Sequence, residues 1–231
     1  MSNQPGSIVQ EDYDRLVAER RVCHRCAPDL VNQSEVDGGR HDSPHIGAWS
    51  RWQGRLDARL MVVGQDWGDE SAFRAQVGME KRGNPTNSNL VKLLGVAGIS
   101  IDAPDQQLGN ASVFLTNAVL CLKSGGLQGP VKQQWFQNCS GFLRSQMAIV
   151  RPKAVVALGT KAYCAVLSAY GLRYENFRDE VQNPNGRALP GRMVVFAVYH
   201  CGARGVNINR KMDHQVNDWL RIRHYLASQQ E

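Results

Sequence analysis

Three side chains that could take part in catalysis lie at the ends of apolar segments of the chain. Asp66 follows RLMVVGQ, Asn117 lies in SVFLTNAVL, and His200 ends RMVVFAVYH. A carboxylate can act as a base or stabilise a cation, an imidazole can donate a hydrogen bond, and an amide offers both a donor and an acceptor. Each residue also has a structural alternative, because Asp can cap a helix, Asn can close a turn and His can pack in an interior.

The hydrophobic pattern predicts the elements that must position these residues. Four short runs rich in Val, Leu and Phe lack the alternation of a sheet with one wet face, and they predict buried strands at 59–65, 112–120, 153–159 and 192–200. Helical spacing of apolar residues predicts helices at 8–22, 86–99, 130–150, 161–172 and 210–228. This alternation predicts an α/β fold, a three-layer α/β/α sandwich around a central, mainly parallel four-stranded sheet. We expect one domain over 1–231, with an N-terminal arm at 1–56 that is irregular from 27 onward.

The carboxyl ends of parallel strands meet at one edge of a sheet, and ligands bind at that edge in open α/β folds. Gln65, Asp66, Asn117 and His200 all fall at such ends. If these residues had only structural roles, such as capping a helix, closing a turn or packing in the interior, all four would have to have such roles at the same edge. Their convergence therefore predicts a ligand pocket at this edge.

Four cysteines have the arrangement of metal ligands. Cys23 and Cys26 form the C-x2-C sequence CHRC, Cys121 directly follows the second strand, and Cys139 lies in the next helix. Disulfides are disfavoured in the cytoplasm, so thiolates in this arrangement favour a metal site, either tetrahedral zinc or an iron–sulfur cluster. The alternative is that Cys121 and Cys139 are buried apolar residues, as free cysteines commonly are.

Charge and composition limit the class of protein and of partner. Lys and Arg number 27 against 21 Asp and Glu, a net charge of +6 that favours a polyanionic partner such as nucleic acid. No stretch approaches the ~20 apolar residues of a membrane span, and the N-terminal residues lack the basic and apolar regions of a secretory signal. We therefore expect a cytoplasmic monomer that does not contact membranes.

The motifs, taken in their order along the chain, resemble those of the uracil-DNA glycosylase superfamily. The sequences that carry the likeness are the C-x2-C pair, VVGQDWG, LTNAVLC, the later Cys139, RPKAVVALG and VYHCGARG. They run from about residue 10 to about residue 210, and they are most similar to the iron–sulfur class often called family 4. Several motifs in the right order on the right elements make this likeness specific.

The resemblance implies a cofactor and an activity. Cys23, Cys26, Cys121 and Cys139 would bind a [4Fe–4S] cluster that holds the arm and the loop after the second strand against DNA. The enzyme would be a monofunctional glycosylase of base-excision repair. It would hydrolyse the N-glycosidic bond of uracil flipped out of single- or double-stranded DNA, leaving an abasic site.

The resemblance also implies roles for individual residues. Asp66 would face the anomeric carbon as electrostatic partner and weak base, and His200 would donate a hydrogen bond to uracil O2 as negative charge grows there. Arg204, four residues after His200, would fill the gap left in the duplex or meet phosphates. The residues expected to bind the base are Gly64, Gln65, Trp67 and Asn117, the last reading uracil O4 and N3–H.

Departures from the family pattern leave two other functions open. Gln65-Asp66 resembles the first motif of family 1, whose Asp orients the attacking water, whereas family 4 has Gly-Glu in this motif. Gly68 stands where family 1 has a Tyr that excludes the thymine methyl group, and Thr86 stands where family 4 has a Phe that stacks on uracil. The alternatives are a glycosylase for another deaminated or mismatched base, and a non-catalytic DNA-binding module with a structural metal.

Overall fold

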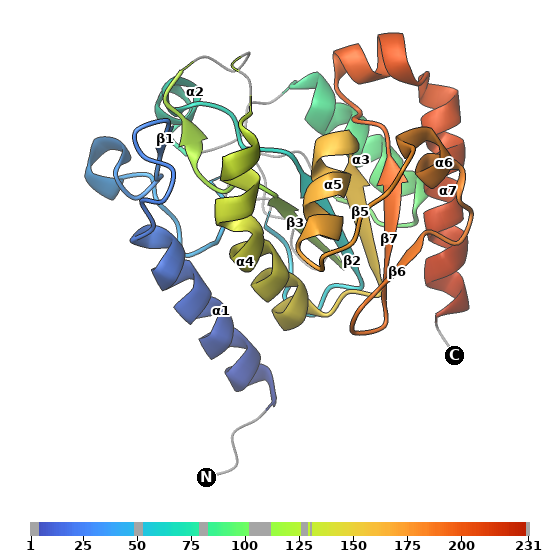
Figure 1. Ribbon diagram of the computed structural model, residues 1–231, viewed down its shortest axis with the longest axis horizontal. Coiled ribbons are helices and arrows are strands. Elements are labelled where there is room, and N and C mark those ends of the chain that lie inside the picture. The colour runs from blue at the N-terminus through green and yellow to red at the C-terminus, as the bar shows by residue number, and fades with distance from the viewer. Residues whose placement is uncertain are drawn as a thin grey trace.

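The strand-forming runs assemble into a central five-stranded sheet. The computed structural model describes residues 5–48, 53–78, 83–101, 112–125, 129 and 131–229. The strands in the sheet have the spatial order β3 (Val113–Asn117), β2 (Leu60–Gly64), β5 (Ala154–Leu158), β7 (Met193–Val198) and β6 (Arg187–Leu189). The first four pair in parallel and β6 pairs antiparallel with β7, so four carboxyl ends meet at one edge (Figure 1).

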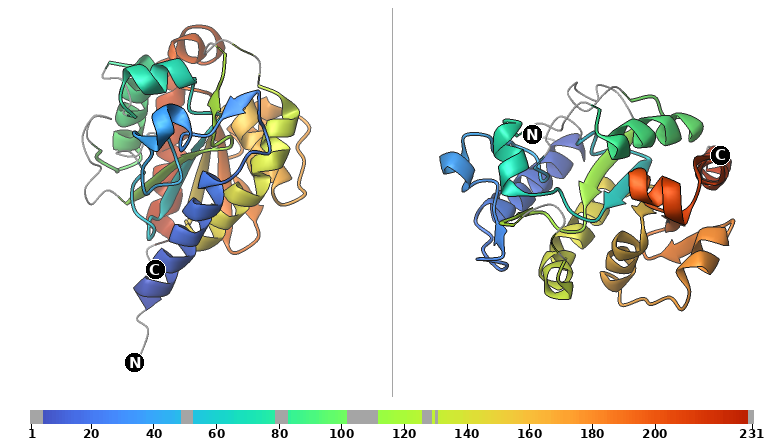
Figure 2. Two further views of the ribbon diagram at one scale, coloured as in Figure 1. Left: turned by 90° about the vertical axis from the view of Figure 1, so that its left-hand side faces the viewer. Right: turned by 90° about the horizontal axis from the view of Figure 1, so that it is seen from above.

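Successive residues of each central strand point to opposite faces, and both faces are covered by helices. Met61 and Val63 of β2 belong to the core beneath α1 (Pro5–Arg21), α4 (Gln133–Val150) and α5 (Thr160–Ser168). Leu60 and Val62 belong to the core beneath α3 (Pro85–Val96) and α7 (Met212–Ser228). The view from above in Figure 2 shows these two helical layers on either side of the strands. The predicted three-layer α/β/α architecture is confirmed.

The four predicted strands are β2, β3, β5 and β7, and the structure adds three short ones. The edge strand β6 has no apolar run that could have marked it. The arm, expected to be irregular from 27 onward, contains β1 (Leu30–Val31) and the 3-10 turn η1 (Val36–Gly39), and β1 pairs antiparallel with β4 (Leu122–Lys123). The described elements also include two short helices, α2 (Glu70–Ala75) and α6 (Phe177–Gln182). The boundaries of the single domain and the monomeric state stay predictions.

The helices of the described chain are amphipathic or short, and none of them combines the length and apolarity needed to cross a bilayer. Helix α4 begins at Gln133, after Lys132 as its N-cap residue, rather than at the predicted Pro130, which lies outside the described residues.

A buried ion pair holds the arm together. Arg20 is fully buried at the end of α1, and its guanidinium lies 2.9 Å from the Asp42 carboxylate and donates to the carbonyl of His45 at 2.9 Å. Burial lowers the pKa of Arg20, whereas the charge of Asp42 opposes that shift. Arg21 also pairs with Asp42 at 2.9 Å. Because buried charges are tolerated only when they are paired, these contacts fix the path of residues 20–45.

Replacement of Arg20 by Met should therefore destabilise the protein strongly. Loss of Arg20 removes the buried partner of Asp42 and leaves only the half-exposed Arg21 to pair with it. We expect about 3 kcal/mol less free energy of unfolding, the low end of the usual range because Arg21 remains. The matched control is Arg15→Met on the same helix, whose exposed pair with Asp12 should contribute less than about 1 kcal/mol. Urea unfolding followed by circular dichroism measures both. Equal losses in the two variants would contradict this account of the arm.

Candidate active site

The pocket edge is built first by the ends of two neighbouring strands. Gly64 ends β2 and is paired with Asn117 at the end of β3. A Cβ atom on Gly64 would lie 1.9 Å from Oδ1 of Asn117, so only glycine lets the amide lie across the strand end. The backbone N–H groups of Ala118 and Val119 donate to the carbonyls of Gly64 (2.9 Å) and Gln65 (3.0 Å), which locks the two loops together.

The Asn117 side chain is largely buried at this edge. It is 9 % exposed, and no residue of the described chain hydrogen bonds to its amide. A buried amide that lacks protein partners costs free energy unless water or a ligand supplies them. The arrangement leaves both the donor and the acceptor of Asn117 available to a bound molecule.

Asp66 is held in one orientation by three groups. Its Oδ2 accepts a hydrogen bond from Nε2 of Gln65 at 2.7 Å, and its Oδ1 accepts one from the backbone N–H of Gly68 at 3.1 Å. Nζ of Lys123 lies 3.3 Å from the same Oδ1, with the carboxylate side chain only 10 % exposed and the lysine side chain 7 % exposed. The carboxylate is therefore both oriented and charge-balanced inside the protein.

His200 begins a loop in which small residues allow close backbone approach. A Cβ atom on Gly205 would lie 1.8 Å from the carbonyl oxygen of His200, and one on Gly202 would lie 2.9 Å from its Cε1 atom. The N–H of Gly202 donates to Nδ1 of His200 at 3.1 Å. His200 as a whole residue reaches solvent, but the protein packed around its ring lowers the pKa of the imidazole. A neutral imidazole whose Nδ1 accepts a hydrogen bond carries its proton on Nε2, so Nε2–H is the free donor.

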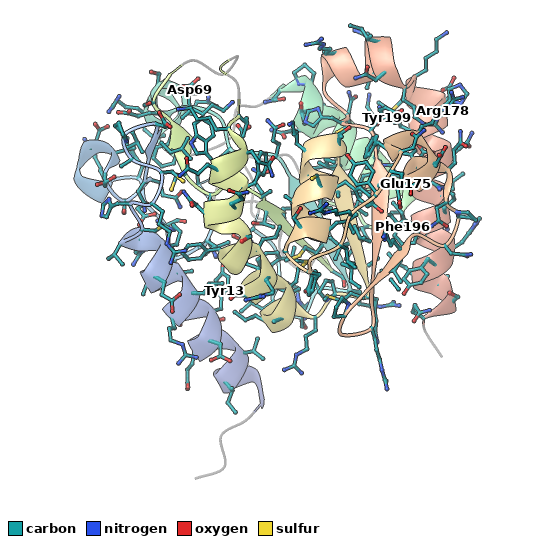
Figure 3. All side chains as sticks on the ribbon, viewed as in Figure 1. Tyr13, Asp69, Glu175, Arg178, Phe196 and Tyr199 are labelled. Atoms are coloured by element: carbon teal, nitrogen blue, oxygen red, sulfur yellow. The ribbon has the colours of Figure 1, made fainter. Side chains whose placement is uncertain are left out.

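Asp66 and His200 lie within electrostatic reach of each other. The negative charge of Asp66 acts on the His200 ring and opposes, without overcoming, the lowering of its pKa by burial. Figure 3 shows Tyr199, which precedes His200, above Phe196 at the upper end of β7, and Asp69, three residues after Asp66, is also in the upper part of the molecule. The carboxylate and the imidazole are therefore near enough to interact through their charges.

Trp67 and Arg204 occupy different surroundings from these residues. The Trp67 ring packs against Gly47, whose added Cβ would lie 2.4 Å from Cζ2 of the ring, and it contacts a small apolar cluster that includes Phe73. Phe73 is fully buried and cannot stack on a ligand. Arg204 is exposed and caps the π-helical turn η3 (Gly205–Asn209). A role for Trp67 in base binding, and one for Arg204 in DNA binding, stay predictions.

The four cysteines of the predicted metal site gather where the arm meets the start of α4. Burial and the negative charges of Cys139, Cys23 and Cys26 raise the pKa of Cys121. Burial also raises the pKa of Cys139, to about 11, and the thiolates of Cys26 and Cys23 add to that shift. Within the described part of the chain, no three His, Cys, Asp or Glu side chains are close enough to hold a metal ion. The four cysteines are near enough to influence one another's pKa, but their sulfurs do not converge on one metal position.

Asn138 is a contact of this cysteine group that the sequence did not mark. Its Nδ2 atom donates to Sγ of Cys26 at 3.3 Å and to the carbonyl of Arg25 at 3.0 Å. Lys123, whose Nζ lies beside the Asp66 carboxylate, is a second residue that the sequence did not mark. The only available signal was its position two residues after Cys121, because a lysine in an otherwise apolar stretch normally indicates a solvated turn.

Comparison with known proteins agrees with this geometry. The family model described as the uracil DNA glycosylase superfamily matches residues 52–221. A type-5 uracil-DNA glycosylase of Pyrobaculum aerophilum is 33 % identical over 210 residues, 86 % of this chain and 86 % of that protein. A type-4 uracil-DNA glycosylase of Thermotoga maritima is 26 % identical over 157 residues, 67 % of this chain and 66 % of that protein. With a family match over most of its length and the strand-end residues in place, the chain belongs to the uracil-DNA glycosylase superfamily.

Proposed function

We propose that this protein is a monofunctional uracil-DNA glycosylase of base-excision repair, which hydrolyses the N-glycosidic bond of uracil flipped out of DNA. The observation that supports this most directly is the oriented Asp66 carboxylate within electrostatic reach of the neutral His200 ring. Cleavage of this bond passes through a cationic sugar and an anionic leaving base, so it needs one group for each charge. Asp66 and His200 supply those two groups.

His200 stabilises the leaving base. Negative charge grows on uracil O2 as the bond to the sugar breaks, and a preorganised donor at that oxygen contributes about 3–4 kcal/mol in comparable enzymes. The Nε2–H of His200 is such a donor, because Gly202 fixes the ring by its hydrogen bond to Nδ1. A neutral ring does this without giving up its proton to the base.

Asp66 stabilises the sugar and positions water. An ionised carboxylate has about four lone-pair sites, and Gln65, Gly68 and Lys123 occupy three of them. The remaining site is free to accept a hydrogen bond from the attacking water. The fixed negative charge also lowers the energy of the developing oxocarbenium ion, which adds an electrostatic contribution to the general-base one.

Asn117 reads the base. Its Nδ2 donates to uracil O4 and its Oδ1 accepts from N3–H, whereas cytosine presents the opposite pattern and would leave the amide mismatched. The absence of described protein partners for this buried amide supports that role. Gly64 makes room for the amide, and Gln65 contributes through its backbone at the same strand end.

The loop after His200 is suited to contact the DNA strand from which the base leaves. Arg204 is exposed. Ile208, in the following π-helical turn, is 72 % exposed, and among the large apolar side chains of the described residues only Val22 is as exposed. An Arg head can fill the vacated space or meet phosphates, and an exposed apolar side chain can wedge between base steps. The net charge of +6 favours binding to single- or double-stranded DNA in general.

The four cysteines would supply the ligands of a [4Fe–4S] cluster, with structural zinc as the alternative. Tetrahedral zinc holds each sulfur at about 2.3 Å, so four zinc-binding sulfurs surround one point closely. A cluster stands between its thiolates and spaces them more widely. Cys23, Cys26, Cys121 and Cys139 influence one another electrostatically, so the four sulfurs lie near one another where the arm meets α4. When bound, the cluster would hold the arm to the loop after β3 and to α4, a structural contribution.

A panel of DNA substrates with single modified bases tests the proposed activity. We expect an abasic product from uracil, detected by alkali cleavage, and a decrease in kcat of at least about 100-fold in Asp66→Asn and in His200→Ala. The exposed neighbours Asp213 and His214 of α7 provide matched controls, because Asp213→Asn and His214→Ala should leave the rate unchanged. Product from a thymine mismatch or hypoxanthine but not from uracil would instead indicate the alternative glycosylase suggested by Gly68 and Thr86. DNA binding without product from any base would indicate a non-catalytic module.

The low pKa of His200 gives the reaction a defined response to acid. Burial moves the pKa below the ordinary value of 6.5, so the ring should remain neutral, and active, at that pH. We expect kcat/KM to stay constant from about pH 8 to 6.5 and to fall only at lower pH, as the ring gains a second proton and loses the Gly202 hydrogen bond. The residual kcat/KM of His200→Ala should not show the fall below pH 6.5 that protonation of His200 causes. A rate that rises on acidification through pH 6.5 would mean that the protonated ring is the active form.

Elemental analysis and absorbance test the cluster. Protein purified without oxygen should be brown and contain about four iron atoms per chain. Cys121→Ser should lose iron, whereas Cys164→Ser should keep it, because Cys164 lies on α5 and contacts Ser168 instead. Zinc in place of iron would contradict the cluster and leave the glycosylase proposal standing.

A further inference from the structure

We propose that Lys123 is a positioning residue for Asp66 and that it connects the catalytic carboxylate to the cysteine-bearing arm. The inference rests on the proposed function, because it assigns Lys123 a part in the reaction that Asp66 performs. It concerns a residue that the superfamily match alone does not single out.

The immediate contact is a buried ion pair. Nζ of Lys123 lies 3.3 Å from Oδ1 of Asp66, and the two side chains are 7 % and 10 % exposed. Opposite charges at this separation interact several times more strongly in a protein interior than in water. The pair therefore balances the charge of Asp66 inside the protein, and it fixes the carboxylate plane together with the Gln65 and Gly68 hydrogen bonds.

Lys123 also holds the backbone of the catalytic loop. Its N–H donates to the carbonyl of Gly68 at 2.9 Å, and a parallel bridge joins Lys123 to Asp69. Lys123 thus contacts the loop at two points: its backbone N–H bonds to Gly68, and its ammonium group pairs with Asp66. A shift of β4 would move the loop backbone and the charge opposite Asp66 together.

The other edge of β4 leads to the arm. Lys123 is the register partner of Leu30 in β1, and the N–H of Leu30 donates to the carbonyl of Cys26 at 3.0 Å. Cys121 is only two residues before Lys123. Direct contacts therefore run from the C-x2-C turn through β1 and β4 to Asp66. The arm and its cysteine group act on the chemistry by setting where Lys123 lies.

The ammonium group is not the nucleophile or the base of this reaction. It is paired with Asp66 inside the protein, and a protonated amine has no lone pair to offer. A phosphate ligand is a second reading, but Lys123 is almost fully buried beneath the loop that it holds. The remaining role is to orient and charge-balance the carboxylate.

Steady-state kinetics of the full-length protein with its metal bound tests this role. Lys123→Met should lower kcat for uracil DNA at least about 10-fold with KM nearly unchanged, and Lys123→Arg should recover part of the loss. Lys153→Met removes the same charge from an exposed site at the amino end of β5, and it should leave kcat unchanged. Lys123→Met combined with Asp66→Asn should be no slower than Asp66→Asn alone, since the two residues act as a unit.

Each other outcome has a definite meaning. An unchanged kcat in Lys123→Met, a raised KM with kcat preserved, or full additivity with Asp66→Asn would overturn the inference. Trapping of a covalent DNA adduct by borohydride in the wild type but not in Lys123→Met would make Lys123 a nucleophile and would also overturn it. Iron content and thermal unfolding of each variant identify one that has merely failed to fold, and Lys123→Arg then carries the test. A wild-type protein that is inactive on every base would contradict both the proposed function and this inference. If the wild type is active, the Lys123 variants test this inference alone.

Discussion

The charge of Asp66 is the constraint on which the surrounding structure depends. An ionised carboxylate with little exposure is tolerated only if nearby groups replace the water that it has lost. Three groups from two segments do so here: Gln65 and Gly68 from its own loop, and Lys123 from β4. Because Lys123 reaches the loop only if β4 lies beside it, the orientation of one carboxylate requires that the two-stranded sheet of the arm be formed.

His200 satisfies the opposite requirement. Its surroundings favour the neutral ring, and the nearby Asp66 charge is not strong enough to reverse that preference. In the proposed reaction, a protonated imidazole would be attracted to the Asp66 charge and would no longer serve as a neutral donor to the base. The N–H of Gly202 holds the ring by its Nδ1 atom, so in the proposed reaction the two charges would develop on the substrate and not between the side chains.

The sequence was sufficient to predict the apolar strands and the residues at their ends. It was not sufficient to predict the short strands and contacts that depend on pairing between distant segments. The parallel strands were visible because each is a continuous apolar run, and their order along the chain placed Asp66, Asn117 and His200 at one edge. Strand β6 and the β1–β4 pair are two or three residues long, too short for any pattern to develop. Lys123 was invisible for the same reason, since its burial follows from a partner more than fifty residues away and not from its neighbours.

The arm explains why the cysteines are so far apart in the sequence. Cys23 and Cys26 come before β1, and Cys121 and Cys139 flank the return of the chain through β4 into α4. A two-stranded sheet with two residues in each strand cannot be stable alone. Buried contacts must fix both of its ends: on one side Arg20 with Asp42, and on the other the cysteine group together with Asn138. The cysteine group and the buried ion pair therefore serve the same purpose, which is to order a segment whose own hydrogen bonds are too few to keep β4 in place beneath the loop that carries Asp66.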